Sequence, residues 1–163
     1  MFKSNIQIMR PFGPSIAKVK IPESLMISLN DYIDKIISNE NKSKELDHGS
    51  RLAGNVKQEF RLELEFVKSS GLLNFLASAS RKWVELTENK KMNKFNLSSS
   101  WVVRQFKNEY NPIHHHGAHL SGVGYLKLPK NFGKNFQDKK NYNYNGKLQL
   151  IHGSQMFNCN STF

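Results

Sequence analysis

The hydrophobic pattern changes once along the chain, near residue 98, and this change limits the folds that the chain can adopt. Before it, apolar residues recur every three or four positions, as they do on helices. After it, apolar and polar residues alternate, as they do on strands. The patterns predict a helical N-terminal part over residues 1–97 and a β-rich part over residues 98–163. Because 163 residues is the length of one domain, we expect a single α+β domain that is mainly β with flanking helices.

Two helices are predicted in the N-terminal part. The first starts with Pro22, a residue favoured in the first helical turn, and should end near Asn39. The second should start near Ser70. Residues 39–49 and 87–96 are expected to be polar connections, and residues 60–66 alternate like a strand although their composition also permits a helix. The apolar faces consist of Leu25, Leu29, Tyr32, Ile33, Ile36 and Ile37 in the first helix and Leu72, Leu73, Leu76, Ala79, Trp83 and Leu86 in the second.

Three strands are predicted in the C-terminal part, over residues 100–106, 120–128 and 147–152. Residues 129–146 lie between the last two and are rich in Asn, Lys, Gly and Tyr. We expect them to form a long exposed loop, either a lid over a site or a solvated connection.

The composition narrows the function classes. The net charge of +11 suits an anionic partner such as nucleic acid, but the basic residues are scattered, so a solubilising surface is the preferred interpretation. We expect no membrane segment, because no run approaches the roughly 18 apolar residues of a membrane helix. The N-terminus also lacks the apolar core of a signal peptide, so we expect a cytoplasmic protein. The single Cys159 excludes an internal disulfide and a cysteine-based zinc site.

The most informative motif is a histidine cluster, which holds four of the six histidines within residues 114–119. In an extended segment residues i and i+2 face the same way, so His114 and His116 can converge on one metal ion. His119 is expected on the opposite face, at a rim, and His152 is as compatible with a structural role as with metal binding. Solvated loop histidines are the alternative to a metal site.

Three kinds of metal site use H-x-H or H-x-carboxylate on a β scaffold. A zinc hydrolase of the H-E-x-x-H type is excluded by the absence of that motif. A cupin motif is incomplete, because Leu120 and Ser121 stand where a Glu is required. The third kind is the non-haem Fe(II) facial triad, whose open positions accept O2 and a cosubstrate.

Four segments after residue 100 resemble a family of 2-oxoglutarate/Fe(II)-dependent oxygenases common in marine bacteria and their phages. They are WVVRQF (101–106), NEYNPIHHHG (108–117), LSGVGYLKLP (120–129) and GKLQLIHG (146–153). LAGNVKQEF (52–60) resembles the N-terminal region of the same family. The resemblance implies a double-stranded β-helix (jelly roll) with outer helices. It also implies Fe(II) as the metal, 2-oxoglutarate as cosubstrate, and a bacterial or phage-infected host cell.

The resemblance also implies roles for individual residues. His114 matches the first iron ligand. His116 stands where the wider superfamily has Asp or Glu, so it either binds the metal or leaves a position for a halide or water. Tyr125 resembles a tyrosine that hydrogen-bonds the distal carboxylate of 2-oxoglutarate, with a buried structural tyrosine as the alternative. Arg104, or its neighbour Gln105, is a candidate to reach the cosubstrate from the preceding strand.

The chain departs from the family pattern at its end. The distal histidine and the Arg or Lys that pairs with the cosubstrate carboxylate would follow residue 152, and none of the later residues matches them. We therefore expect a jelly roll that is incomplete at the C-terminus, with His152 as a substitute third ligand. Exposed sheet edges would then favour a homo-oligomer.

The functional prediction is an oxygenase that hydroxylates a substrate of unidentified class. The alternative is a non-catalytic cupin-like or β-sandwich module that binds metal through its histidines.

Overall fold

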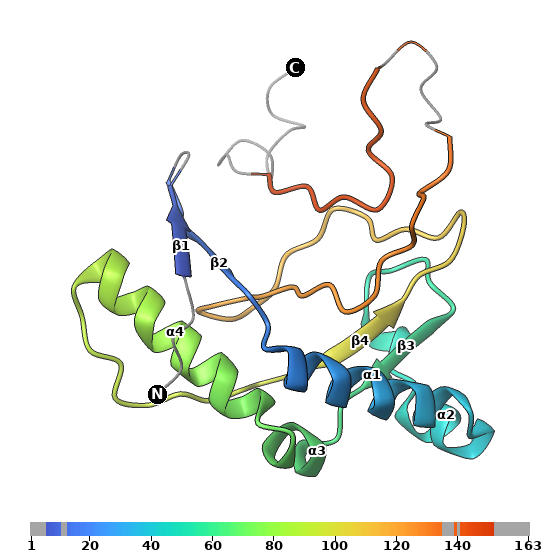
Figure 1. Cartoon of the computed structure of the whole chain (residues 1–163), viewed down its shortest axis with the longest axis horizontal. Helices are drawn as coiled ribbons and strands as arrows, with labels where there is room; N and C mark the ends of the chain where they lie inside the picture. Colours follow the sequence, from blue (N-terminus) through green and yellow to red (C-terminus); the bar gives the residue numbers. More distant parts are fainter. Residues whose placement is uncertain (1–5, 11–12, 135–138, 140, 152–163) are drawn as a thin grey trace.

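The computed structural model describes residues 6–10, 13–134, 139 and 141–151. These residues form an α+β structure, which confirms the class expected from the sequence (Figure 1). The elements are β1 (Ile6–Met9), β2 (Ile16–Val19), α1 (Glu23–Ile37), α2 (Glu40–Leu46), the 3-10 turn η1 (Gly49–Arg51), β3 (Gln58–Arg61), α3 (Leu64–Ser69), α4 (Leu72–Glu88) and β4 (Trp101–Arg104).

The two predicted helices are confirmed as α1 and α4. Pro22 is the N-cap of α1, and Glu23 and Lys35 place charges of the favourable sign in its first and last turns. Helix α4 starts after Gly71, whose φ of 83° places it in the left-handed region, and ends before the left-handed Asn89.

The prediction of a turn-rich connection over residues 39–49 was wrong, because this segment contains α2. The Asn39 side chain accepts a hydrogen bond from the backbone N–H of Lys42 and so caps the helix at 3.0 Å. An ion pair of 2.6 Å joins Lys44 to Glu40 one turn earlier. Local capping and pairing therefore make a short polar helix where hydrophobic periodicity gives no signal.

Residues 60–66 divide into the end of strand β3 and the start of helix α3, so both patterns noted in the sequence are present. The strand β3 pairs antiparallel with β4, with Gln58 opposite Arg104 and Arg61 opposite Trp101. The strand predicted over residues 100–106 is thus confirmed, with residues 101–104 as its observed extent. A second antiparallel pair, β1 with β2, was not predicted from the sequence.

The predicted strands over residues 120–128 and 147–152 are wrong as far as the structure describes them, and residue 152 lies outside the described residues. Val123, Leu128 and Leu150 are 63%, 60% and 63% exposed. A strand needs a hydrogen-bonded neighbour, and the described residues provide none for these segments. The described chain thus has two two-stranded sheets and four helices, no barrel or jelly roll, and is not mainly β.

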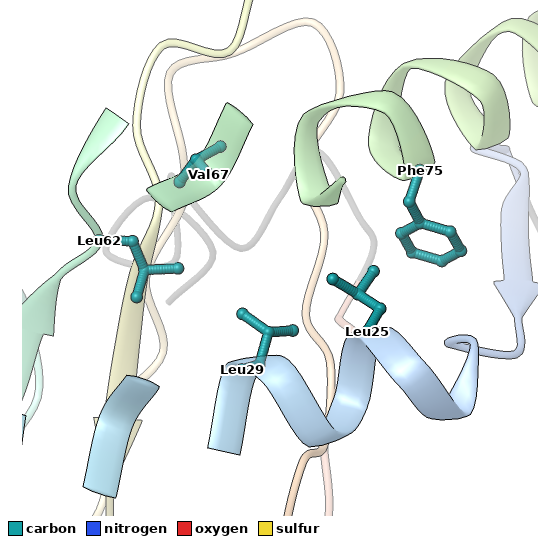
Figure 2. Packing of buried hydrophobic residues seen from close by; sticks show 5 residues of the cluster. All are labelled: Leu25, Leu29, Leu62, Val67 and Phe75. Carbon is teal, nitrogen blue, oxygen red and sulfur yellow. The ribbon is translucent and has the colours of Figure 1, made fainter. Parts of the chain in front are cut away.

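The core lies between the helices and β3. One cluster joins α1, α3 and α4 and consists of Leu25, Leu29, Leu62, Val67 and Phe75 (Figure 2). A second cluster of Ile36, Leu46 and Phe60 joins α1, α2 and β3, and the partly buried Tyr32 and Val102 contact both. Burying one such side chain contributes about 1.5–3 kcal/mol, so these clusters hold the helices on the sheet.

The chain after β4 runs as an irregular trace on the opposite side of Figure 1 from α3. In the described ranges every fully buried apolar residue precedes residue 76, so this later segment is held by hydrogen bonds and partial burial. No helix in those ranges has the length and apolar character that crossing a membrane requires.

Candidate metal centre

The histidine segment is tied to β3 by the turn that follows β4. Glu109 accepts hydrogen bonds from the backbone N–H groups of Phe106 and Lys57, at 2.8 and 3.3 Å. The backbone N–H of Asn55 donates to the carbonyl of Tyr110 at 2.8 Å. These bonds place the chain leading to His114 alongside the segment that precedes β3.

His114 and His116 lie together, as their i and i+2 spacing predicts. Their Nε2 atoms are 3.0 Å apart, and their ring centroids are 4.9 Å apart. Two nitrogens bound at about 2.1 Å to one metal ion and about 90° apart are separated by about 3.0 Å. The pair therefore fits two adjacent ligand positions of an octahedral ion, and imidazole suits iron.

The hydrogen bonds of the two Nδ1 atoms determine which Nε2 atoms can bind a metal ion. His114 Nδ1 lies 2.8 Å from the carbonyl oxygen of Pro112, which can only accept, so Nδ1 carries the proton and Nε2 offers its lone pair. His116 Nδ1 lies 2.6 Å from the Ser121 hydroxyl, which can donate or accept. With His116 protonated on Nε2, this ring donates to His114. With the proton on Nδ1, it donates to Ser121 and the Nε2 atoms of both rings carry lone pairs that a metal ion can accept.

The surroundings favour the uncharged form of His116. Burial lowers the pKa of His116, and the neighbouring His114 and His115 lower it further. Trp101 on β4 contacts the His116 ring edge to face, with centroids 5.4 Å apart. A neutral imidazole held against a rigid aromatic ring is the form that binds a metal ion.

The described residues do not complete a metal site. In those ranges no three His, Cys, Asp or Glu side chains are grouped so that they could hold a metal ion. His152, the expected third ligand, lies outside the described residues. His119 is exposed.

The two expected cosubstrate residues lie on the surface. Arg104 donates a 3.0 Å hydrogen bond to the side chain of Gln58 and stacks over Phe106, with 4.9 Å from Cζ to the ring centroid. Gln105 donates to the carbonyl of Glu109. Tyr125 is 46% exposed. The structure therefore groups His114 with His116 and gives Arg104 contacts on the β3–β4 sheet.

Sequence analysis missed Ser121 and Trp101 as neighbours of the histidines. Ser121 lies five residues after His116, and that spacing alone does not show that the chain after Gly117 brings its hydroxyl back to the His116 ring. The contact of Trp101 depends on how the loop between β4 and His116 returns to that strand, so neither neighbour has a local signal.

Residues 99–161 match the model of a family described as "Putative 2OG-Fe(II) oxygenase", in which 2OG is 2-oxoglutarate. The match includes both histidines and leaves out the helical part that holds the core. The family implies Fe(II) and 2-oxoglutarate as cofactors, as expected from the sequence. No curated protein and no solved structure matches the chain.

Proposed function

We propose that this chain is an Fe(II)- and 2-oxoglutarate-dependent oxygenase that hydroxylates a substrate and releases succinate and CO2. The observation that carries the proposal is the pair of His114 and His116 Nε2 atoms, 3.0 Å apart, inside the segment that matches the oxygenase family. Bound Fe(II) would supply the activation of O2, with one oxygen atom going to the substrate and the other to succinate.

The residues of this chain have defined tasks in the proposal. His114 and His116 hold the metal through Nε2, while Pro112 and Ser121 orient the two rings from the other side. Tyr125 and Arg104 are proposed to bind the carboxylate of 2-oxoglutarate. His152 is proposed as the third ligand.

Residues 1–97 and 98–163 are proposed to belong to one domain, with residues 1–97 as its helical part and residues 98–163 as the part related to the oxygenase family. Support comes from the contacts between the two parts, because strand β4 of the second part pairs with β3 of the first and Lys127 forms a 3.1 Å ion pair with Asp34 on α1.

Anaerobic titration of the metal-free protein with Fe(II) and then 2-oxoglutarate tests the proposal. We expect the charge-transfer absorbance of the chelated complex in the wild type and its loss in His114→Ala. His119 lies in the same segment but outside the His114–His116 pair, so His119→Ala is the matched control and should keep the band. No band in the wild type, or an equal band in His114→Ala, would contradict the proposal.

The second candidate is a non-catalytic metal-binding module. It is favoured by the absence of a third grouped ligand in the described ranges. Such a module predicts that Zn2+ or Ni2+ binds through His114 and His116 while addition of 2-oxoglutarate changes nothing. The same titration, repeated with and without 2-oxoglutarate, separates the two candidates.

A further inference from the structure

The carboxylate of Glu59 on β3 has no partner although it is buried. The residue is 1% exposed, and neither Oε1 nor Oε2 has a hydrogen-bond partner in the described structure. An ionised carboxylate out of water costs several kcal/mol unless it is paired or bound to a cation. Glu59 therefore requires a proton or a cation.

Other oxygen atoms border the same space. A Cβ atom built on Gly54 would lie 2.7 Å from Glu59 Oε1 and 2.5 Å from Asn111 Oδ1. A Cβ atom built on Gly49 would lie 3.5 Å from Glu59 Oε2 and 3.4 Å from Asp47 Oδ1. Glu59 Oε1 and Asn111 Oδ1 thus border the space at Gly54, which a side chain at position 54 would fill, and Asp47 Oδ1 lies on the Oε2 side of the same carboxylate.

The charge around Glu59 is negative. Burial raises the pKa of Glu59 most, and the charges of Asp47 and Glu109 raise it further. Glu109 accepts backbone N–H groups with both of its oxygens, so it adds charge and no free oxygen, whereas Asp47 accepts from the Gly49 N–H with Oδ1 alone, at 3.0 Å. None of these influences favours the ionised form of Glu59. A bound cation is what would stabilise that form.

We propose that Asp47, Glu59 and Asn111 form a binding site for a hard divalent cation, Ca2+. Two carboxylates and a carboxamide give an all-oxygen ligand set, which Ca2+ prefers and which softer metals do not. Water completes the six to eight ligands that Ca2+ takes. Asp47 and Asn111 are exposed and Glu59 is buried, so solvent reaches the two outer ligands and an ion would arrive from their side.

The site lies between two segments that are far apart in the sequence. Asp47 and Glu59 flank η1 and belong to the N-terminal part, whereas Asn111 precedes His114 by three residues. The bridge between Asn55 and Tyr110 already brings these segments together. A bound Ca2+ would fasten the histidine segment to β3 whether or not the histidines bind iron.

Terbium provides the direct test, because Tb3+ occupies Ca2+ sites and emits when a nearby tryptophan is excited. Trp101 lies opposite Arg61, two residues from Glu59 along β3. With the chelator-treated full chain we expect saturable Tb3+ emission that Ca2+ displaces. Glu59→Gln should weaken Ca2+ binding at least tenfold, as measured by calorimetry.

Two further variants keep the test independent of folding. Asp47→Asn and Asn111→Ala change exposed side chains and should each weaken Ca2+ binding severalfold, whereas Asp31→Asn, an exposed carboxylate on α1, should not. His114→Ala should bind Ca2+ like the wild type, so loss of the iron site leaves this result unchanged.

If Glu59 holds a proton instead, the wild type shows no saturable Ca2+ binding at millimolar concentration. Glu59→Gln would then match or exceed the thermal stability of the wild type with and without Ca2+. Equal Ca2+ binding by the wild type and Glu59→Gln would also overturn the proposal.

Discussion

The hydroxyl of Tyr32 on α1 donates a 2.7 Å hydrogen bond to the carboxylate of Glu63, which lies between β3 and α3. Lys42 on α2 reaches the other carboxylate oxygen at 2.7 Å. The Tyr32 ring also stacks on Phe66, with centroids 3.6 Å apart. One carboxylate thus connects three helices at the edge of the core.

Tyr32→Phe should abolish the loss of stability that the wild type shows at alkaline pH through Tyr32. Burial raises the pKa of Tyr32 to about 12, and the hydrogen bond to Glu63 raises it too. The unfolded chain ionises first, so this contribution is present below about pH 10 and is lost as the pH rises toward 12. Phe keeps the ring stacking and costs about 1 kcal/mol at neutral pH. Urea unfolding between pH 7 and 11 measures the difference, which should shrink as the pH rises.

Glu63→Gln should reduce the fall in unfolding free energy that the wild type shows at acid pH. The hydrogen bond from Lys42 lowers the pKa of Glu63 most, followed by that from Tyr32. The stabilisation is therefore present above the ordinary pKa and is lost as the pH falls through the lowered value. Because both side chains are partly exposed, salt should reduce the effect. An unchanged dependence on pH below 5 in the variant would show that the ion pair does not stabilise the fold.

Leu29→Ala should destabilise the chain by about 3 kcal/mol, since it leaves a cavity in the cluster shared by α1, α3 and α4. Ile27 on the same helix is 55% exposed, so Ile27→Ala is the matched control and should change the free energy of unfolding little. Similar losses in both variants would mean that α1 packs with a different face.

The helices of this chain could be predicted from the sequence, whereas most of its strand pairing could not. Helices α1 and α4 carry apolar stripes, a local pattern, and both were predicted within a few residues of their observed ends. The β1–β2 hairpin and the partners of residues 120–128 depend on pairing between distant segments, which periodicity does not encode. Residues 120–128 alternate like a strand, yet the described chain supplies no ladder for them.

In the candidate site, too, local features could be predicted from the sequence and contacts between distant residues could not. The spacing of His114 and His116 predicts that they share a face, because two residues is the strand period, and the rings do lie together. The contacts from Ser121 and Trp101 require the chain to turn back, and the carboxylate of Glu59 shows its lack of a partner only after burial is known. Sequence therefore indicates the candidate ligands, while the groups that orient them come from tertiary structure.

Ser121→Ala should weaken metal binding by His114 and His116 without removing either ring. In the metal-binding tautomer His116 carries its proton on Nδ1, and the Ser121 hydroxyl at 2.6 Å is the acceptor. Losing such an outer partner typically costs 10- to 100-fold in metal affinity. Competition titration with Co2+ measures the change, and Ser121→Thr, which keeps the hydroxyl, should restore most of the affinity. Equal Co2+ affinity in Ser121→Ala and the wild type would mean that Ser121 does not orient His116 in the metal-bound protein.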